Sequence, residues 1–399
     1  MTTDTTASWA AAFRSAVISP YEDIELFALR GFSAQTVRQV LRLDGGGSAV
    51  RIRLTNRYGK EPLHIGGARL ARRTQGSGID SGSDTPLRVA GAEEFTVPAG
   101  QDVITDPVEL AVAAGDELAV SLWLPADTGL TTYSAVPLRT GWAVPGEALS
   151  ATAFDGADGL EELVTRHFIS GADVLAPAGT AVAVAFGDSW FEGTGTTNDT
   201  DRRFPDLLNR RLREAGSSAT TGLVDWVVNQ GLSANRLLTD EIGEHALARL
   251  ERDVLDVPGV THVLIHFGLN DLGIPGQEAY PATAPVPTAA DLIAGFTTLA
   301  ERLHAAGLTV IAATVGPYKD TLYDGYATPE GVAIAREVSD WIRGAESPFD
   351  AYADFVTAVA DPADPDRIHD VYDSGDGLHV NDAGAQALAD SVHLLDLKV

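Results

Sequence analysis

The sequence predicts two domains of different fold class, an all-β domain over residues 1–177 and an α/β domain over residues 178–399. Up to residue 177, short runs with apolar residues at every second position are separated by turn-forming residues, which is typical of a β-sandwich or jelly roll. Beyond it, apolar strands alternate with amphipathic helices, and this alternation indicates a parallel sheet. The pattern changes at Ala176-Pro-Ala-Gly179, where we expect the hinge.

Two runs in the first part show the strand pattern most clearly. In residues 49–55 the apolar side chains are Val50, Ile52 and Leu54, and the alternating polar side chains are Arg51, Arg53 and Thr55. In residues 117–124 the side chains expected to face inward are Leu118, Val120, Leu122 and Leu124. A period of two residues places each apolar set on one face of a half-buried strand.

In the second part, strands are predicted over residues 181–186, 223–228, 260–267 and 308–314, because each is a short apolar run suited to a buried strand. Helices are predicted where apolar residues recur on one face, over residues 204–215, 244–255, 289–306 and 382–394. Gly216 and Gly307 follow two of these helices, at the position where glycine commonly ends a helix.

Polar segments stand where the predicted strands end. The first strand runs into Gly187-Asp-Ser189, the second apolar run into Asn229-Gln-Gly231 and the third into Gly268-Leu-Asn-Asp271, while Asp376-Gly-Leu-His379 precedes the last helix. Ligands of parallel α/β sheets bind at the carboxyl edge of the strands, so we expect these segments to lie together. A serine hydroxyl becomes a nucleophile when an imidazole takes its proton and a carboxylate orients that imidazole.

The sequence resembles the SGNH, or GDSL-type, hydrolase superfamily in these four segments. The matching residues are Ser189, Gly231, Asn270 and His379. The resemblance covers residues 180 to 399 and implies a three-layer α/β/α, flavodoxin-like domain with esterase activity. The preceding β-domain is similar to that of some bacterial GDSL-type esterases, and some of those relatives act on carbohydrate esters such as acetylated xylan.

The resemblance and the chemistry of ester hydrolysis together give each residue a role. Ser189 is the expected nucleophile, His379 the general base and Asp376 the carboxylate that orients the imidazole. The oxyanion of the tetrahedral intermediate is expected to accept hydrogen bonds from the Ser189 N–H, the Gly231 N–H and the Asn270 side-chain amide. Glycine suits this position because a backbone without Cβ can approach the reacting centre closely.

The residue after the nucleophile is commonly small or aliphatic in relatives, whereas here it is Trp190. Two interpretations stay open: the indole fills part of the acyl pocket and favours acetyl groups, or it packs under the site as core. Asp188 and Asp271 are expected to hold loops by accepting hydrogen bonds from backbone N–H groups. His262 and His266 lie on an apolar strand and are expected to be core or edge residues.

Composition excludes several classes of function. With 28 basic and 56 acidic residues, the net charge of −28 would repel nucleic acids and anionic membrane surfaces. There are no cysteines, no run of 18 apolar residues and no histidine and carboxylate cluster with metal-ligand spacing, so we expect no disulfide, membrane span, metal or cofactor. The first residues lack a signal peptide, which fits either a cytoplasmic protein or one whose signal was removed, and no feature indicates an oligomeric state.

The sequence therefore predicts a serine esterase acting on short-chain carboxylic esters, such as O-acetyl groups on carbohydrates, with the β-domain assisting recognition. One alternative is a lipase, lysophospholipase or thioesterase, which needs an apolar entrance that the sequence does not indicate. A second alternative is a catalytically inert carbohydrate-binding protein. The presence of the complete serine, glycine, asparagine, aspartate and histidine set argues against the inert protein.

Overall fold

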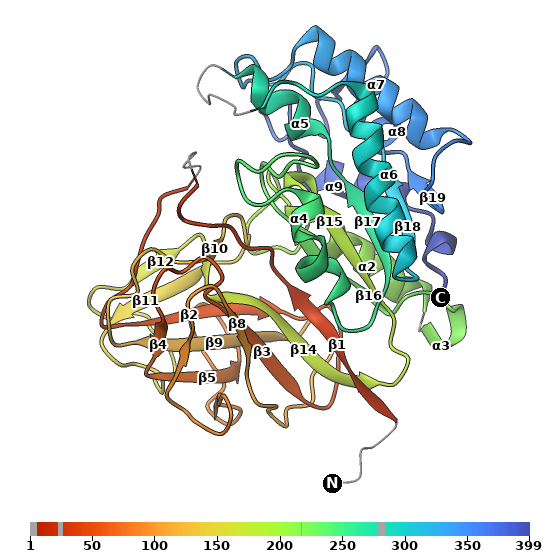
Figure 1. Ribbon diagram of the computed structural model, residues 1–399. Coiled ribbons are helices and arrows are strands. Elements are labelled where there is room, and N and C mark those ends of the chain that lie inside the picture. The colour runs from red at the N-terminus through yellow and green to blue at the C-terminus, as the bar shows by residue number, and fades with distance from the viewer. Residues whose placement is uncertain (1–5, 23–26, 217, 278–283) are drawn as a thin grey trace. The chain divides into compact units, whose positions relative to one another are not determined.

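A computed structural model describes residues 6–22, 27–216, 218–277 and 284–399. The chain divides into two compact units, residues 1–180 and residues 181–399. The first unit contains strands and the second contains both strands and helices, in the order that the sequence pattern predicts. Figure 1 shows the first unit in red to yellow-green and the second in green to blue.

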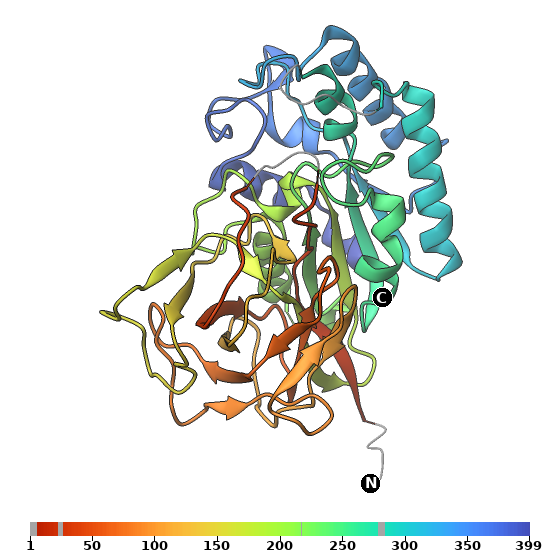
Figure 2. The ribbon, with the colours of Figure 1, turned by 60° about the vertical axis from the view of Figure 1, so that its left-hand side comes forward.

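The first unit is built from antiparallel strands, and its described residues contain no helix. Its four-stranded sheet has the order β1 (Ala7–Arg14), β14 (Ile169–Pro177), β3 (Val50–Thr55) and β8 (Asp102–Ile104). Its six-stranded sheet has the order β12 (Glu161–Leu163), β11 (Gly141–Pro145), β2 (Gln35–Arg42), β9 (Glu117–Leu124), β5 (Gly67–Arg72) and β6 (Thr85–Pro86). Two further pairs are β4 (Leu63–Ile65) with β7 (Phe95–Val97) and β10 (Tyr133–Ser134) with β13 (Arg166–His167). Figure 2 shows these strands from a second direction.

The apolar faces predicted for β3 and β9 are buried, which confirms the period-two pattern. The opposite faces of these strands are also partly covered. Thr55 is buried, and so are Ala119 and Ser121 on the second face of β9. Ser121 accepts a hydrogen bond of 2.8 Å from the buried guanidinium of Arg38, which also donates to the backbone of Ser77 at 2.7 Å. Neighbouring segments thus cover part of the second face of β9 as well.

The arginines on the polar face of β3 pair with one buried carboxylate. Asp173 of β14 accepts from Arg51 at 2.9 Å, from Arg53 at 3.2 Å and from Arg14 of β1 at 2.6 Å. Burial alone would raise the pKa of Asp173, but the guanidinium groups of Arg14 and Arg53 outweigh burial and lower it. The polar face of this strand is therefore an ion-pair cluster inside the four-stranded sheet.

The second unit contains a five-stranded parallel sheet with the order β16 (Trp226–Gly231), β15 (Val182–Gly187), β17 (Val260–His266), β18 (Thr309–Ala313) and β19 (Ala351–Ala353). In chain order this is 2-1-3-4-5. The first strand, β15, pairs in parallel with β16 on one side and β17 on the other. The chain passes from β15 to β16 on one side and then crosses to β17 on the other side of β15. Ligands of open α/β sheets bind at such a switch point in the strand order. Ser189 follows β15 and stands at this point.

Helices connect the strands of the second unit. They are α1 (Ser189–Glu192), α2 (Phe204–Ala215), α3 (Ser218–Thr221), α4 (Ala246–Leu250), α5 (Leu269–Gly273), α6 (Ala289–Ala305), α7 (Pro329–Arg343), α8 (Phe355–Val359) and α9 (Asp382–Ser391). Shorter elements are the π-helix η1 (Glu251–Leu255), the 3-10 helices η2 (Ile274–Gly276) and η3 (Leu394–Leu397), and the strand pair β20 (Ala360–Asp361) and β21 (Asp364–Ile368). The long helices α6 and α7 pack beside each other in both views (Figures 1 and 2).

The predicted helix over residues 204–215 coincides with α2, and the other three begin or end within a few residues of their predicted bounds. The prediction for the second strand is wrong at both ends, because β16 begins at Trp226 and includes residues 229–231. Residues 223–224 pair instead with the end of the chain, where the Val224 N–H donates to the Leu397 carbonyl at 2.8 Å. The segment 229–231 stays in the sheet because Gly231 pairs with Gly187 of β15.

Candidate active site

The chain makes a sharp turn from β15 into α1, and this turn presents Ser189. The Asp188 side chain caps the helix by accepting a hydrogen bond of 3.1 Å from the Trp190 N–H. Gly187 is required at the turn, because a Cβ there would lie 2.9 Å from the His266 carbonyl oxygen and 2.7 Å from the Phe191 ring. The predicted backbone-holding role of Asp188 is thereby confirmed.

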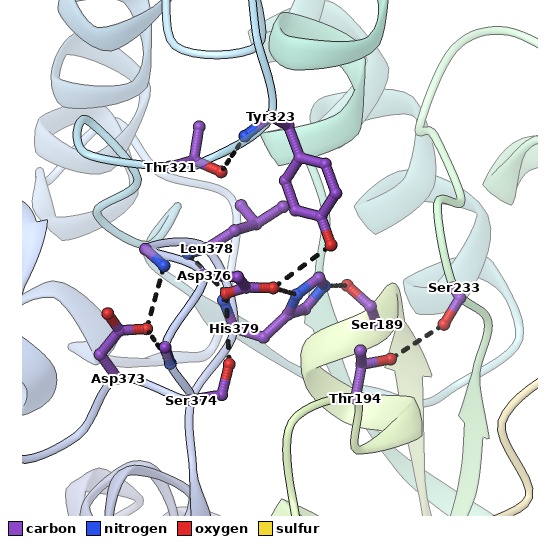
Figure 3. A network of polar contacts seen from close by, with 12 residues as sticks. Ser189, Thr194, Ser233, Thr321, Tyr323, Asp373, Ser374, Asp376, Leu378 and His379 are labelled. Atoms are coloured by element: carbon purple, nitrogen blue, oxygen red, sulfur yellow. Dashed lines mark hydrogen bonds and ion pairs between the residues drawn. The ribbon is translucent and has the colours of Figure 1, made fainter.

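Ser189, His379 and Asp376 form a continuous chain of hydrogen bonds (Figure 3). The Ser189 Oγ lies 3.0 Å from the His379 Nε2, and the His379 Nδ1 lies 2.6 Å from the Asp376 Oδ2. With its Nδ1–H donated to the carboxylate, the imidazole presents Nε2 as an acceptor to the serine hydroxyl. The structure therefore brings together the three residues that the sequence analysis names as nucleophile, base and orienting carboxylate.

Asp376 is fixed by its own loop. Its Oδ1 accepts from the His379 N–H at 2.8 Å, from the Leu378 N–H at 2.9 Å and from the Ser374 hydroxyl at 3.2 Å. Burial alone would raise the pKa of Asp376, but the hydrogen bonds and charge of His379 and the backbone N–H groups outweigh it and hold the pKa well below the ordinary value. The carboxylate therefore stays ionised at neutral pH.

A tyrosine that the sequence analysis did not single out stands beside this chain. The Tyr323 ring meets the His379 ring edge to face, with centroids 6.4 Å apart, and its hydroxyl lies 3.4 Å from the Asp376 Oδ2 (Figure 3). The neighbouring Leu322 N–H donates to the Asp376 carbonyl at 2.8 Å. Both residues belong to the loop that follows β18, and their position after a predicted strand is the signal that could have identified them.

Asn270 lies in α5, directly after β17, and its side chain is engaged on both sides. The Nδ2 donates to the Asn235 carbonyl at 3.0 Å, and the Oδ1 accepts from the Tyr326 hydroxyl at 2.8 Å. The second N–H of this amide donates to no residue that the structure describes. The sequence analysis did not single out Tyr326, just as it did not single out Tyr323.

Gly231 ends β16 next to the nucleophile helix. A Cβ at this position would lie 2.1 Å from the Glu192 nitrogen and 2.6 Å from the Phe191 carbonyl carbon, so only glycine allows the approach. The Gly231 N–H donates to the Asn229 Oδ1 at 2.8 Å. In this arrangement the N–H is engaged within the protein, which differs from its predicted role as an open oxyanion donor.

Trp190 is buried, which supports the second interpretation, in which the indole packs under the site as core. Its side chain is 1% exposed and stacks on the His266 ring at 5.1 Å and on the Phe355 ring at 6.3 Å between centroids. Its indole N–H donates to the Leu378 carbonyl at 2.9 Å. The α1 turn directs this side chain under the sheet edge, so the indole is core and also connects the nucleophile turn to the loop of His379.

The predictions for Asp271, His262 and His266 are confirmed. Both oxygens of the buried Asp271 side chain accept from backbone N–H groups, at 2.8 Å from Leu237 and at 3.0 Å from Leu238. His262 and His266 are buried core residues. The His266 Nδ1 lies 2.9 Å from the Asp188 Oδ1, beneath the nucleophile turn.

Within the described ranges, no group of three or more histidine, aspartate or glutamate side chains is placed to hold a metal ion. No helix in the part of the chain that the structure describes is long and apolar enough to cross a membrane.

A serine, an imidazole and a carboxylate in hydrogen-bond contact at the carboxyl edge of a parallel sheet are the arrangement of α/β enzymes that use a serine nucleophile. The sequence places the protein within this class. Residues 185–387, just over half of the chain, match the GDSL-like Lipase/Acylhydrolase family. The chain belongs to this family and is a carboxylic ester hydrolase, as the resemblance predicted.

Several solved structures resemble the chain over about half of its length. An aryl esterase of M. smegmatis is 18% identical, with a TM-score of 0.38 and coverage of 53% of this chain and 95% of that protein. A carbohydrate acetylesterase from Sinorhizobium meliloti is 15% identical, with a TM-score of 0.36 and coverage of 52% and 94%. An acetyl xylan esterase is 15% identical, with a TM-score of 0.37 and coverage of 53% and 96%. Comparison with the sequences of curated proteins gives no match.

Proposed function

We propose that the protein is a serine esterase that hydrolyses short-chain carboxylic esters, with O-acetyl groups on carbohydrates as its substrate class. The observation that carries the catalytic part is the chain of contacts from Ser189 through His379 to Asp376, with distances of 3.0 and 2.6 Å. These distances are within the hydrogen-bond reach that general-base activation of a serine requires.

In the proposed mechanism, the His379 Nε2 takes the proton of the Ser189 hydroxyl while the Oγ attacks the ester carbonyl carbon. Asp376 stabilises the imidazolium that forms, because its carboxylate stays ionised beside Nδ1. His379 then gives its proton to the leaving alkoxide, and the acyl group remains on Ser189. A water molecule, activated by the same imidazole, hydrolyses the acyl-enzyme and restores the serine.

The tetrahedral intermediates carry a negative charge on the former carbonyl oxygen. We assign its stabilisation to the Asn270 amide and the Ser189 N–H. One N–H of the Asn270 amide donates to the Asn235 carbonyl, while its second N–H and the Ser189 N–H donate to no described residue. We assign Gly231 no donor role, because its N–H donates to the Asn229 side chain. Its lack of a Cβ instead allows the end of β16 to lie close to α1. Loss of one such donor commonly lowers kcat by about 10²- to 10³-fold.

The preference for short acyl groups and polar alcohols is supported by the surface around the site. Among the described residues, the exposed large apolar side chains of the loop that contacts Asp376 and His379 are Leu322 and Tyr323. Within its described residues this loop presents no further exposed large apolar side chain to a long acyl chain. The net charge of −28 also disfavours anionic lipid surfaces.

The domain arrangement belongs to the same proposal. We infer that residues 178–399 form a three-layer α/β/α, flavodoxin-like catalytic domain, which the 2-1-3-4-5 order of its parallel strands supports. We infer that residues 1–177 form a β-sandwich domain, and its two larger antiparallel sheets support this fold. We also propose that this domain assists recognition of carbohydrate.

The test is a panel of p-nitrophenyl esters from acetyl to dodecanoyl, run beside acetylated xylan and acetylated monosaccharides, with Ser189→Ala as the control. We expect the highest kcat/KM for acetyl esters and release of acetate from the sugars. An optimum at eight to twelve carbons would support the lipase or thioesterase alternative instead. Absence of turnover with every ester would support an inert carbohydrate-binding protein.

A further inference from the structure

The orientation of the Asn270 amide is set by its two neighbours. The Asn235 carbonyl can only accept a hydrogen bond, so the amide nitrogen must face it, at 3.0 Å. The amide oxygen is then directed at the Tyr326 hydroxyl, 2.8 Å away, and this hydroxyl must be the donor. The remaining amide N–H has a fixed direction, although no described residue accepts from it.

The Tyr326 ring is held in one position. Its side chain is 3% exposed, and it meets the Tyr318 ring edge to face with centroids 5.7 Å apart. Gly273 of α5 lies so close to the ring that a Cβ there would be 2.2 Å from the Tyr326 Cε1. Burial first, and then the nearby charge of Asp188, raise the pKa of Tyr326 well above the ordinary value, so the hydroxyl keeps the proton it donates.

The same loop also contacts the His379 side of the site. Four residues before Tyr326, the Leu322 N–H donates to the Asp376 carbonyl at 2.8 Å. The Tyr323 hydroxyl lies 3.4 Å from the Asp376 carboxylate. One short segment between β18 and α7 thus contacts the orienting carboxylate at one end and Asn270 at the other.

We propose that Tyr326 is a positioning residue for ester hydrolysis: its buried hydroxyl fixes the Asn270 amide so that one amide N–H points at the oxyanion. This inference rests on the proposed role of Asn270 as an oxyanion donor. A donor that is already oriented needs no reorganisation when charge develops, which is the main source of stabilisation in such sites. The hydrogen bond to the amide oxygen also polarises the amide and strengthens its N–H as a donor.

The experiment is a double-mutant cycle with Tyr326→Phe, Asn270→Ala and the double variant, assayed with p-nitrophenyl acetate. Tyr326→Phe keeps the ring and removes only the hydroxyl. We expect it to lower kcat by about 10-fold, as for the loss of one hydrogen bond, with KM changed by less than about twofold. Asn270→Ala should lower kcat by about 10²- to 10³-fold, and adding Tyr326→Phe to it should cause no further decrease.

The cycle separates failure of this inference from failure of the proposed function. An unchanged kcat in Asn270→Ala would show that Asn270 is no oxyanion donor, and the proposed oxyanion site would fail. A large decrease in Asn270→Ala with none in Tyr326→Phe would refute only the positioning role. A decrease caused by Tyr326→Phe that is equally large in the Asn270→Ala background would also refute it, because the hydroxyl would then act by another route.

Tyr318→Phe is the matched control. Tyr318 is also a buried tyrosine, it packs against Tyr326, and its hydroxyl has no hydrogen-bond partner among the described residues. The kcat of Tyr318→Phe should equal that of the unchanged protein. An equal decrease in kcat in Tyr318→Phe and Tyr326→Phe would overturn the inference. Should Tyr326→Phe fold poorly, Gly273→Ala displaces the same ring by contact, and its kcat should fall in the same way except in the Asn270→Ala background.

Discussion

Replacing Trp190 separates a structural role of the indole from a role in choosing the acyl group. The side chain is 1% exposed, and its N–H donates to the Leu378 carbonyl at 2.9 Å. Trp190→Phe keeps an aromatic ring but leaves a buried carbonyl without its donor, which costs about 1–3 kcal/mol. Trp190→Ala removes the ring and leaves a cavity, which costs about 3–5 kcal/mol.

These free energies correspond to measurable shifts in melting temperature. For a domain of about 150–250 residues, each kcal/mol lowers Tm by about 2–4 °C. We therefore expect Tm to fall by about 2–12 °C in Trp190→Phe and by about 6–20 °C in Trp190→Ala for the unit that contains the site. Differential scanning calorimetry of the full chain can follow this transition.

The kinetic part of this prediction concerns ratios. Leu378 directly precedes His379, so both variants should lower kcat for all esters alike, and the ratio of kcat/KM between acetyl and octanoyl esters should stay constant. Trp341→Phe is a control, because this indole of α7 packs against the Phe296 ring of α6 and the Phe349 ring and has no ring contact with the site residues. An unchanged Tm together with a several-fold rise in octanoyl ester hydrolysis would refute the structural interpretation and support the pocket role.

Three further predictions concern the proposed catalytic residues and cofactor requirement. Ser189→Ala and His379→Ala should each abolish ester turnover, and the double variant should be no worse than either, because the groups act as one unit; substantial residual turnover in either single variant would refute the assignment. Asp376→Ala should be milder than both in kcat. The pKa of Asp376 is lowered in the folded state, so its contribution to stability is complete above the unfolded pKa of about 3.9 and is lost as pH falls below it. Asp376→Ala should therefore lose less stability between neutral and acid pH than the unchanged protein does. Acid unfolding followed by circular dichroism measures this difference. Activity should be the same after dialysis against EDTA, and activity that disappears there and returns with a divalent ion would contradict a site made of side chains alone.

The sequence by itself determined the fold class of each part and the family. The alternating pattern of residues 49–55 and 117–124 and the helix pattern of residues 204–215 are local, so propensity and burial on one face decide them. Three short polar segments at the ends of predicted strands and a fourth before the last helix carry the family resemblance, which the match over residues 185–387 confirms. The helix α7 also had a readable signal that the sequence analysis did not use, since Thr328 caps it and a proline follows.

Only the tertiary structure decided how these segments meet. Ser189 and His379 are 190 residues apart, and their contact depends on the strand order and on two loops at one edge of the sheet. The direction of Trp190, the partner of the Gly231 N–H and the contact of Tyr326 with Asn270 all depend on side-chain packing between distant segments. Sequence patterns report which face of an element is apolar, but a single position next to a nucleophile can point into a pocket or into the core with the same pattern. The surrounding strands and loops make that choice, because they determine which space is already filled.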